Sequence, residues 1–238
     1  MSGLTSWVQG IDLSQLIERI FCAGAALIAI SVHESCHGLS AYWLGDDTAK
    51  RQGRISLNPL RHLDLFGFVM MVAFRFGWAK PVPVNPYRMT KIKSPKLGMA
   101  LTAAAGPVSN LFLALLFGLL CCVTGGYYLN GRLYYAGESG TALFYLCQFF
   151  ASCVSLNAGL AVFNLIPISP LDGSKILAIV LPEKSYAQLM RYERYGFILL
   201  ALLLFSGILS GPLSVLVRAV MKGVFALVSP VARLFGGG

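Results

Sequence analysis

The sequence predicts an all-α polytopic membrane protein with about 4–6 transmembrane helices and a short re-entrant or β segment on the cytoplasmic side. The first observation is composition: 56% of the residues are hydrophobic, 12% are charged, and the mean hydropathy is +0.69. Soluble domains carry about 25% charged residues. The second is four apolar segments, at 20–44, 97–123, 141–165 and 195–210. The first three reach the roughly 20 residues that span a bilayer, and the fourth nearly does.

The third observation is the distribution of charge. Ten of the nineteen Lys and Arg residues lie between Lys50 and Lys96, and four more lie between Lys175 and Arg194. Cytoplasmic loops of membrane proteins carry such an excess. We therefore expect 45–96 and 173–194 to face the cytoplasm, and the N-terminus and the 126–140 loop to face outward. A basic segment between membrane spans is rarely a nucleic-acid-binding patch, so we expect no nucleic-acid partner. The expected environment of the protein is the lipid bilayer.

Taken in order, the first three apolar segments are predicted to cross the membrane and 195–210 to run back outward. The first is not expected to be cleaved, because no basic region precedes it as in a signal peptide. The tail at 213–235 fits a surface-lying amphipathic helix as well as a fifth span, since Arg218 and Lys222 share one helical face. The six cysteines lie in apolar segments without a CxxC pair, and we interpret them as core or lipid-facing residues.

The segment at 48–96 is more than a simple loop. It contains a short apolar run, 65–74, and several Gly and Pro residues, including Pro81 and Pro83. Prolines remove N–H donors, so "KPVPVNP" is predicted to be extended and not a central strand. We expect short strands or a re-entrant hairpin that dips into the membrane and lines a cavity. The alternative is an amphipathic loop resting on the headgroups.

A charged motif lies inside the first apolar segment. His33 and His37 are four residues apart and share a helix face, and Glu34 is the only acid well inside a long span. An unpaired glutamate is costly in a membrane. The spacing is H-E-x-x-H, in which two histidines hold zinc and the glutamate takes a proton from the bound water. The simpler interpretation is that these residues hydrogen-bond neighbouring helices without a metal.

A catalytic zinc requires a third protein ligand. The candidates are Asp172, Asp64 and His62. His37 lies seven residues before the end of its span, about 10 Å below the cytoplasmic surface at 1.5 Å per residue. Asp172 follows a helix that approaches the same surface and breaks at Pro167 and Pro170. Depth therefore favours Asp172 over the other two.

These motifs resemble the site-2 protease family of intramembrane zinc metalloproteases. The resemblance is carried by "HESCHG", by "AAAGPVSN" and "FNLIPISPLDGSK", and by "GRISLNPLRHLD" and "GWAKPVPVNP", over residues 20–180. It implies that His33, His37 and Asp172 bind Zn²⁺, that Glu34 is the catalytic base, and that Asn164 faces the scissile peptide. No PDZ or CBS domain is apparent. The whole chain, 1–238, is then one membrane-embedded protease domain, with a catalytic core at about 20–180 and a C-terminal span and tail at 195–238.

The function so implied is regulated intramembrane proteolysis by a zinc metalloendopeptidase. Its substrate would be the helix of a single-pass membrane protein. The setting would be the bacterial inner membrane, with the active site near the cytoplasmic face. The rival interpretations are a zinc protein of another chemistry and a non-catalytic scaffold or transporter. Gly106 and Pro107 are expected to allow close helix packing, and Asn110 to make either an interhelical hydrogen bond or a contact at the site.

Overall fold

A bundle of long helices dominates the computed structural model, which describes residues 13–64, 67 and 79–234. Within these residues, four helices are long and apolar enough to cross a membrane, judged by length and composition: α2 (Leu13–Trp43), α5 (Pro95–Val123), α6 (Ala142–Asn164) and α9 (Ser210–Arg233). The shorter helices are α3 (Thr48–Arg51), α7 (Asp172–Leu177) and the 3₁₀ turns η1 (Pro59–Arg61), η2 (Pro86–Arg88) and η3 (Ala178–Val180). This confirms the predicted all-α polytopic class.

The three predicted spans at 20–44, 97–123 and 141–165 correspond to α2, α5 and α6. The C-terminal region differs from the expectation. Helix α8 (Glu183–Phe205) has only a short apolar part, Tyr195–Phe205, whereas the tail that the sequence left undecided forms α9, which is long enough to span. The fourth candidate span therefore begins at Ser210.

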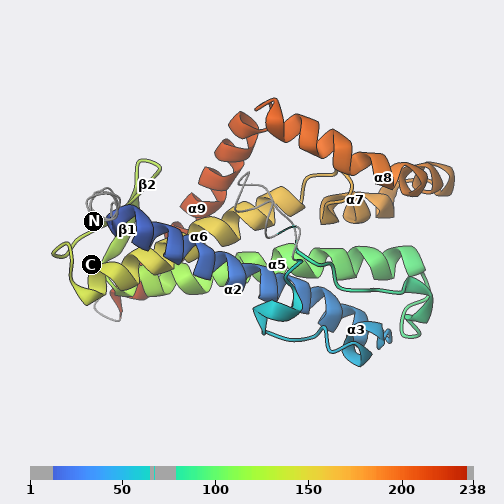
Figure 1. The fold of residues 1–238 in the computed structure, drawn as a ribbon, viewed down its shortest axis with the longest axis horizontal. Helices are drawn as coiled ribbons and strands as arrows, with labels where there is room; N and C mark the ends of the chain where they lie inside the picture. Colours follow the sequence, from blue (N-terminus) through green and yellow to red (C-terminus); the bar gives the residue numbers. More distant parts are fainter. Residues whose placement is uncertain (1–12, 65–66, 68–78, 235–238) are drawn as a thin grey trace, which may run out of the picture.

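The bundle has two distinct ends. One carries α3, α7 and the start of α8, and the other carries the start of α2, the end of α9 and a β hairpin (Figure 1). Helices α2, α5 and α6 pack on one another, and α9 packs on α5 and α6. Small residues fill these contacts: Ala25, Ala29, Ala114, Ala158 and Ala161 have no exposed surface. Small side chains let membrane helices approach closely.

Two of the candidate membrane spans, α5 and α6, start with side-chain caps. Ser94 accepts a hydrogen bond from the Leu97 N–H, and Pro95 occupies the first turn of α5. Thr141 accepts from the Phe144 N–H at the start of α6. Ser and Thr at this position satisfy N–H groups that have no partner within the helix.

The segment between α2 and α5 agrees in part with the prediction. The apolar run at 65–74 lies outside the described residues apart from Gly67. Leu63 and Ala79 form an isolated antiparallel bridge, and residues 80–85 form neither helix nor ladder, as the prolines predict. The one sheet of the described residues lies elsewhere, as the hairpin β1 (Gly126–Leu129) and β2 (Arg132–Tyr135).

The hairpin was not anticipated, although its turn has a clear sequence signal. Asn130 and Gly131 connect the strands and have φ values of 50° and 81°. Positive φ at both central positions of a two-residue turn favours Asn-Gly, and the turn matches the twist of the strands. The segment "YYLNGRLYY" therefore predicts this hairpin on inspection.

Candidate metal centre

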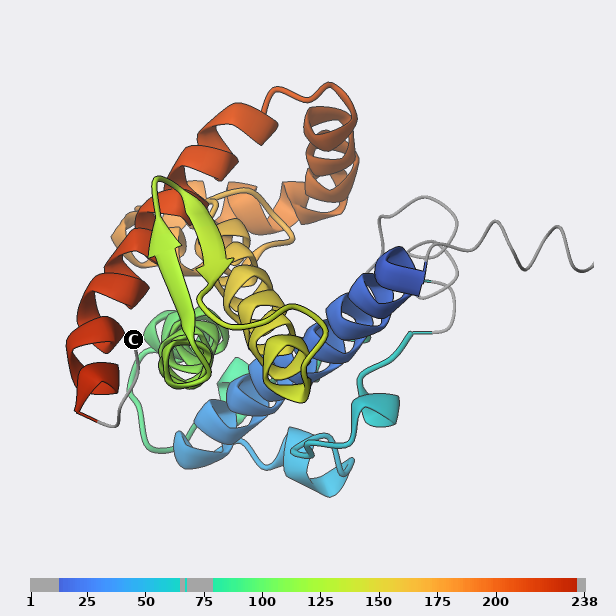
Figure 2. The same cartoon turned by 90° about the vertical axis from the view of Figure 1, so that its left-hand side faces the viewer.

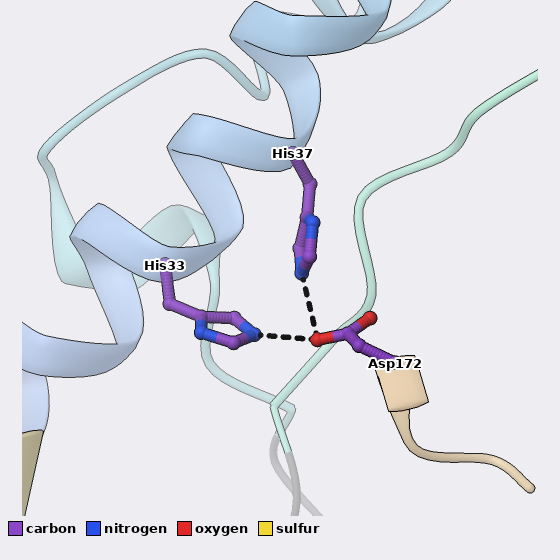
Figure 3. A group of neighbouring side chains, drawn as sticks. All are labelled: His33, His37 and Asp172. Carbon is purple, nitrogen blue, oxygen red and sulfur yellow. Dashed lines mark ion pairs between the residues drawn. The ribbon is translucent and has the colours of Figure 1, made fainter. Parts of the chain in front are cut away.

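Helix α2 and the first residue of α7 bring three potential ligands to one point. His33 Nε2 lies 3.2 Å from Asp172 Oδ2, and His37 Nε2 lies 3.3 Å from the same oxygen. Figure 3 shows both rings projecting from α2 towards this oxygen. All three residues are buried, and their ligand atoms lie within 4.8 Å of one another. The described residues thus contain a group that could hold a metal ion.

The other ring nitrogen of each histidine fixes its tautomer. His37 Nδ1 lies 2.7 Å from the Thr102 carbonyl oxygen, which can only accept, so the proton is on Nδ1. His33 Nδ1 lies 2.5 Å from Asn110 Oδ1. The Asn110 amide nitrogen donates to Ala29 O and to Asn157 Oδ1, which leaves its oxygen as the acceptor for His33. In neutral rings the Nε2 lone pairs therefore point at Asp172.

This donor set fits a zinc ion. Two lone pairs and a carboxylate oxygen face one another, and Asp172 Oδ2 is buried without a hydrogen-bond partner among the described residues. Such an arrangement needs a positive charge between its members. Zinc binds His nitrogen and carboxylate oxygen at about 2.0–2.2 Å, which places the ligands of a tetrahedral site about 3.3 Å apart. The two measured ligand-to-ligand distances match this value.

Gly106 of α5 lies directly against both rings. A Cβ at this position would lie 2.6 Å from His33 Nε2 and 2.5 Å from His37 Cε1. The glycine therefore allows the backbone of α5 to pass the histidines, as the sequence suggested for Gly106 and Pro107. Asn110, one turn further along α5, contacts both His33 and the neighbouring helix, so its two anticipated roles coexist.

Glu34 lies beside the group and contacts the proline-containing segment at 80–85. Its Oε2 accepts a hydrogen bond of 3.0 Å from the Val82 N–H. Pro81 and Pro83 have no N–H, so Val82 supplies the one donor of this three-residue stretch. The segment is anchored on both sides: Lys80 O accepts from Arg54, and the Asn85 N–H donates to buried Asp46.

A cavity of about 240 Å³ opens at these residues. Glu34, both histidines and Asp172 line it, together with Val82, Val84, Asn164 and Lys175. Asn164 is thus near the predicted ligands, but its amide nitrogen donates to Leu160 O of its own helix. Lys175, which the sequence did not single out, adds a positive charge to the wall.

The two alternative third ligands lie elsewhere. His62 is fully buried, and its Nε2 lies 2.7 Å from Ser56 O and 3.4 Å from Ser35 Oγ. Asp64 accepts a hydrogen bond from the Gly67 N–H. Neither belongs to the His33–His37–Asp172 group. Sequence reasoning also missed Asn157, although a buried amide within an apolar segment is itself a sign of interhelical hydrogen bonding.

A membrane helix carrying H-E-x-x-H opposite a buried carboxylate defines a candidate metalloprotease of the membrane-embedded class. The comparisons with known proteins support this class. The model of peptidase family M50 matches residues 21–206. "Putative zinc metalloprotease YwhC" of Bacillus subtilis is 40% identical over 179 residues, covering 74% of this chain and 76% of its own. "Putative zinc metalloprotease Rip2" of Mycolicibacterium smegmatis is 26% identical over 184 residues, covering 75% and 64%. No solved structure matches the chain significantly.

The chain belongs to peptidase family M50, the family of the site-2 proteases. It is therefore a zinc metalloprotease and a multi-pass membrane protein, and its substrates are membrane proteins in the lipid bilayer. This confirms the predicted family, enzyme class and cofactor, and it sets aside the non-catalytic scaffold or transporter.

Proposed function

We propose that His33, His37 and Asp172 bind the zinc ion and that Glu34 is the catalytic base. The observation that carries this proposal is the convergence of His33 Nε2, His37 Nε2 and Asp172 Oδ2 beside Glu34, in a cavity that remains open. Three protein ligands leave a fourth position for water, which is the pattern of catalytic zinc sites.

Bound by these residues, zinc would provide Lewis-acid chemistry and would lower the pKa of an attacking water. Glu34 accepts the proton of that water and returns it to the leaving nitrogen. The Val82 N–H holds Glu34 Oε2 in place, so Oε1 remains available for the proton. Asn164 hydrogen-bonds the scissile carbonyl oxygen after its amide leaves Leu160 O.

The substrate we infer is the transmembrane helix of a single-pass protein, cut in regulated intramembrane proteolysis. The chain acts as one domain over 1–238 in a bacterial inner membrane. The basic loops near α3 and α7 support a position of the candidate metal centre near the cytoplasmic face.

Glu34→Gln tests the proposal. The variant keeps the shape of the side chain and loses its basicity, so bound zinc should be retained while hydrolysis falls by about 10²–10⁴-fold. The measurements are zinc content by mass spectrometry and cleavage of a single-pass substrate in liposomes. Glu18→Gln, an exposed position on the same helix, is the matched control and should cleave normally. Cleavage by Glu34→Gln at the control rate would refute the role of Glu34.

A further inference from the structure

A second cavity lies at the end of the bundle that carries the β hairpin. Its volume is about 280 Å³, and it is enclosed by the end of α5, strand β1 and the C-terminal half of α9. Figure 2 looks onto this end and shows the hairpin in front of α9 and beside α5. The cavity shares no residue with the candidate metal centre.

Two positive side chains line this cavity. Lys222 and Arg233 are eleven residues apart on α9, about three helical turns, and so lie on one face. Neither forms an ion pair with any acid in the part of the chain that the structure describes. Two cations at one cavity, both exposed and unneutralised, favour an anionic ligand.

Tyr128 also lines this cavity. The ring of Tyr128 stacks on Phe225, with centroids 5.3 Å apart and an angle of 10° between the planes. Its hydroxyl is buried and has no hydrogen-bond partner among the described residues. A buried hydroxyl without a partner is unfavourable, and an oxyanion would accept a hydrogen bond from it.

The position of the cavity indicates a lipid. Cys122 and Gly126 line it and flank the end of α5, where a membrane span meets water, and tyrosines are typical of that boundary. On α9 itself, Leu227 and Val231 are 67% and 43% exposed, and Val123 of α5 is 41% exposed. Such apolar side chains suit acyl chains, whereas a free phosphate would make no use of them.

We propose that this cavity binds the headgroup phosphate of an anionic phospholipid. Lys222, Arg233 and the Tyr128 hydroxyl hold the phosphate oxygens, and the acyl chains lie along the exposed apolar side of α9. Basic pockets between membrane helices recognise anionic lipids through the same charge-assisted hydrogen bonds. The lipid would tie the hairpin to α9.

The test uses the full-length, delipidated protein in detergent micelles, titrated with phosphatidylglycerol or phosphatidylcholine. Native mass spectrometry counts the bound lipid. The wild type should bind phosphatidylglycerol in preference to phosphatidylcholine, and the double variant Lys222→Gln/Arg233→Gln should weaken that binding by about tenfold or more. Arg19→Gln changes an exposed arginine in the first turns of α2, a helix that starts at the same end of the bundle, and this variant should bind as the wild type does.

Tyr128→Phe keeps the stacked ring and removes only the hydroxyl, so it tests the site if the double variant does not fold. It should weaken phosphatidylglycerol binding as well. Equal binding of the two lipids, or unchanged binding by both variants, would refute the proposal. Displacement of the lipid by millimolar inorganic phosphate would identify a free-anion site and overturn the lipid assignment.

Discussion

Asp172 and His62 are both buried, yet they have different surroundings. Asp172 Oδ2 faces two imidazole nitrogens and has no hydrogen-bond partner among the described residues. His62 packs beside the α2 residue Ser35 and bonds to the backbone at Ser56. The first environment suits a metal ligand, and the second suits a residue that ties the loop after α3 to α2.

We therefore predict that Asp172→Ala loses zinc and activity, whereas His62→Ala retains zinc. Loss of an outer partner of a metal ligand costs about 10–100-fold in metal affinity, and loss of a ligand should cost more. Zinc content after dialysis against a graded chelator measures the difference. Retention of zinc by Asp172→Ala together with its loss from His62→Ala would make His62 the third ligand.

At the scale of elements, the close contact between α2 and α5 depends on a glycine, which has no side chain. Gly106 leaves the space that both histidine rings occupy, and a Cβ there would come within 2.6 Å of them. Real Cβ atoms do not approach so closely, so a larger residue must separate the helices or turn the rings away from Asp172. By contrast, a Cβ added at Gly159 of α6 would meet no atom of the described residues within 4 Å.

Gly106→Ala should therefore reduce zinc affinity by about 10–100-fold and lower cleavage accordingly, because the ligand rings lose their orientation. Gly159→Ala is the matched control, since it adds the same methyl group to a helix without a contact. Chelator titration and substrate cleavage are measured for both variants. Equal zinc affinity in the two would show that α2 and α5 can separate without disturbing the candidate metal centre.

The proline-containing segment at 80–85 has unused backbone groups. Its described hydrogen bonds involve Lys80, Val82 and Asn85, whereas the Val84 N–H has no backbone partner among the described residues. A substrate helix that unwinds for cleavage exposes N–H and C=O groups that require partners in a dry site. Val84, which lines the cavity, can supply them as the edge of an added strand.

A cysteine at Val84 or Ile55 should therefore form crosslinks with a cysteine near the cleavage site of a substrate. The experiment uses the Glu34→Gln protein without its native cysteines, so that bound substrate remains intact. A cysteine at Leu129, in the hairpin, serves as the control and should not react. Crosslinks confined to the hairpin would contradict both the strand addition and the proposed orientation.

At the scale of the whole molecule, the basic residues of the loops are concentrated at one end of the bundle. The described parts of the basic segment 50–96, which are 50–64 and 79–96, lie at the end of the bundle with α3, α7 and the start of α8, and the hairpin lies at the other end. The positive-inside rule is based on the charges of loops, so we propose that the candidate metal centre faces the cytoplasm. Arg218, Lys222 and Arg233 belong to α9 itself, and we propose that lipid binding accounts for two of them.

Cysteine labelling on intact cells tests this orientation. In a variant without native cysteines, a membrane-impermeant maleimide should label Arg132→Cys in the hairpin. It should label Lys91→Cys, before α5, only after lysis. Both positions are exposed, and both substitutions remove one positive charge, so a difference in labelling reports the side of the membrane and not the accessibility or charge of the position. The reverse labelling pattern would place the candidate metal centre on the outer side.

The amino-acid sequence is sufficient to predict the membrane class, the first three spans and the pair His33 and His37 with Glu34 between them. These are local properties: hydropathy is summed along a segment, and residues four apart share a helix face whatever surrounds them. The same reasoning found the apolar helix at 195–205 but not where it ends, because the break between α8 and α9 falls inside a region that is apolar on both sides. It overlooked the hairpin, although Asn130 and Gly131 mark it.

Which acid faces the histidines, and what holds their rings, depends on contacts between segments that are far apart in the sequence. Asn110 and Thr102 lie 77 and 65 residues from the histidines they contact. Asp172 is further still, and Glu34 meets the Val82 N–H across 48 residues. No spacing rule links such positions, because their distances depend on how closely α2, α5 and α6 pack. That packing depends on small residues such as Gly106, which has no side chain and so leaves room for the two histidine rings.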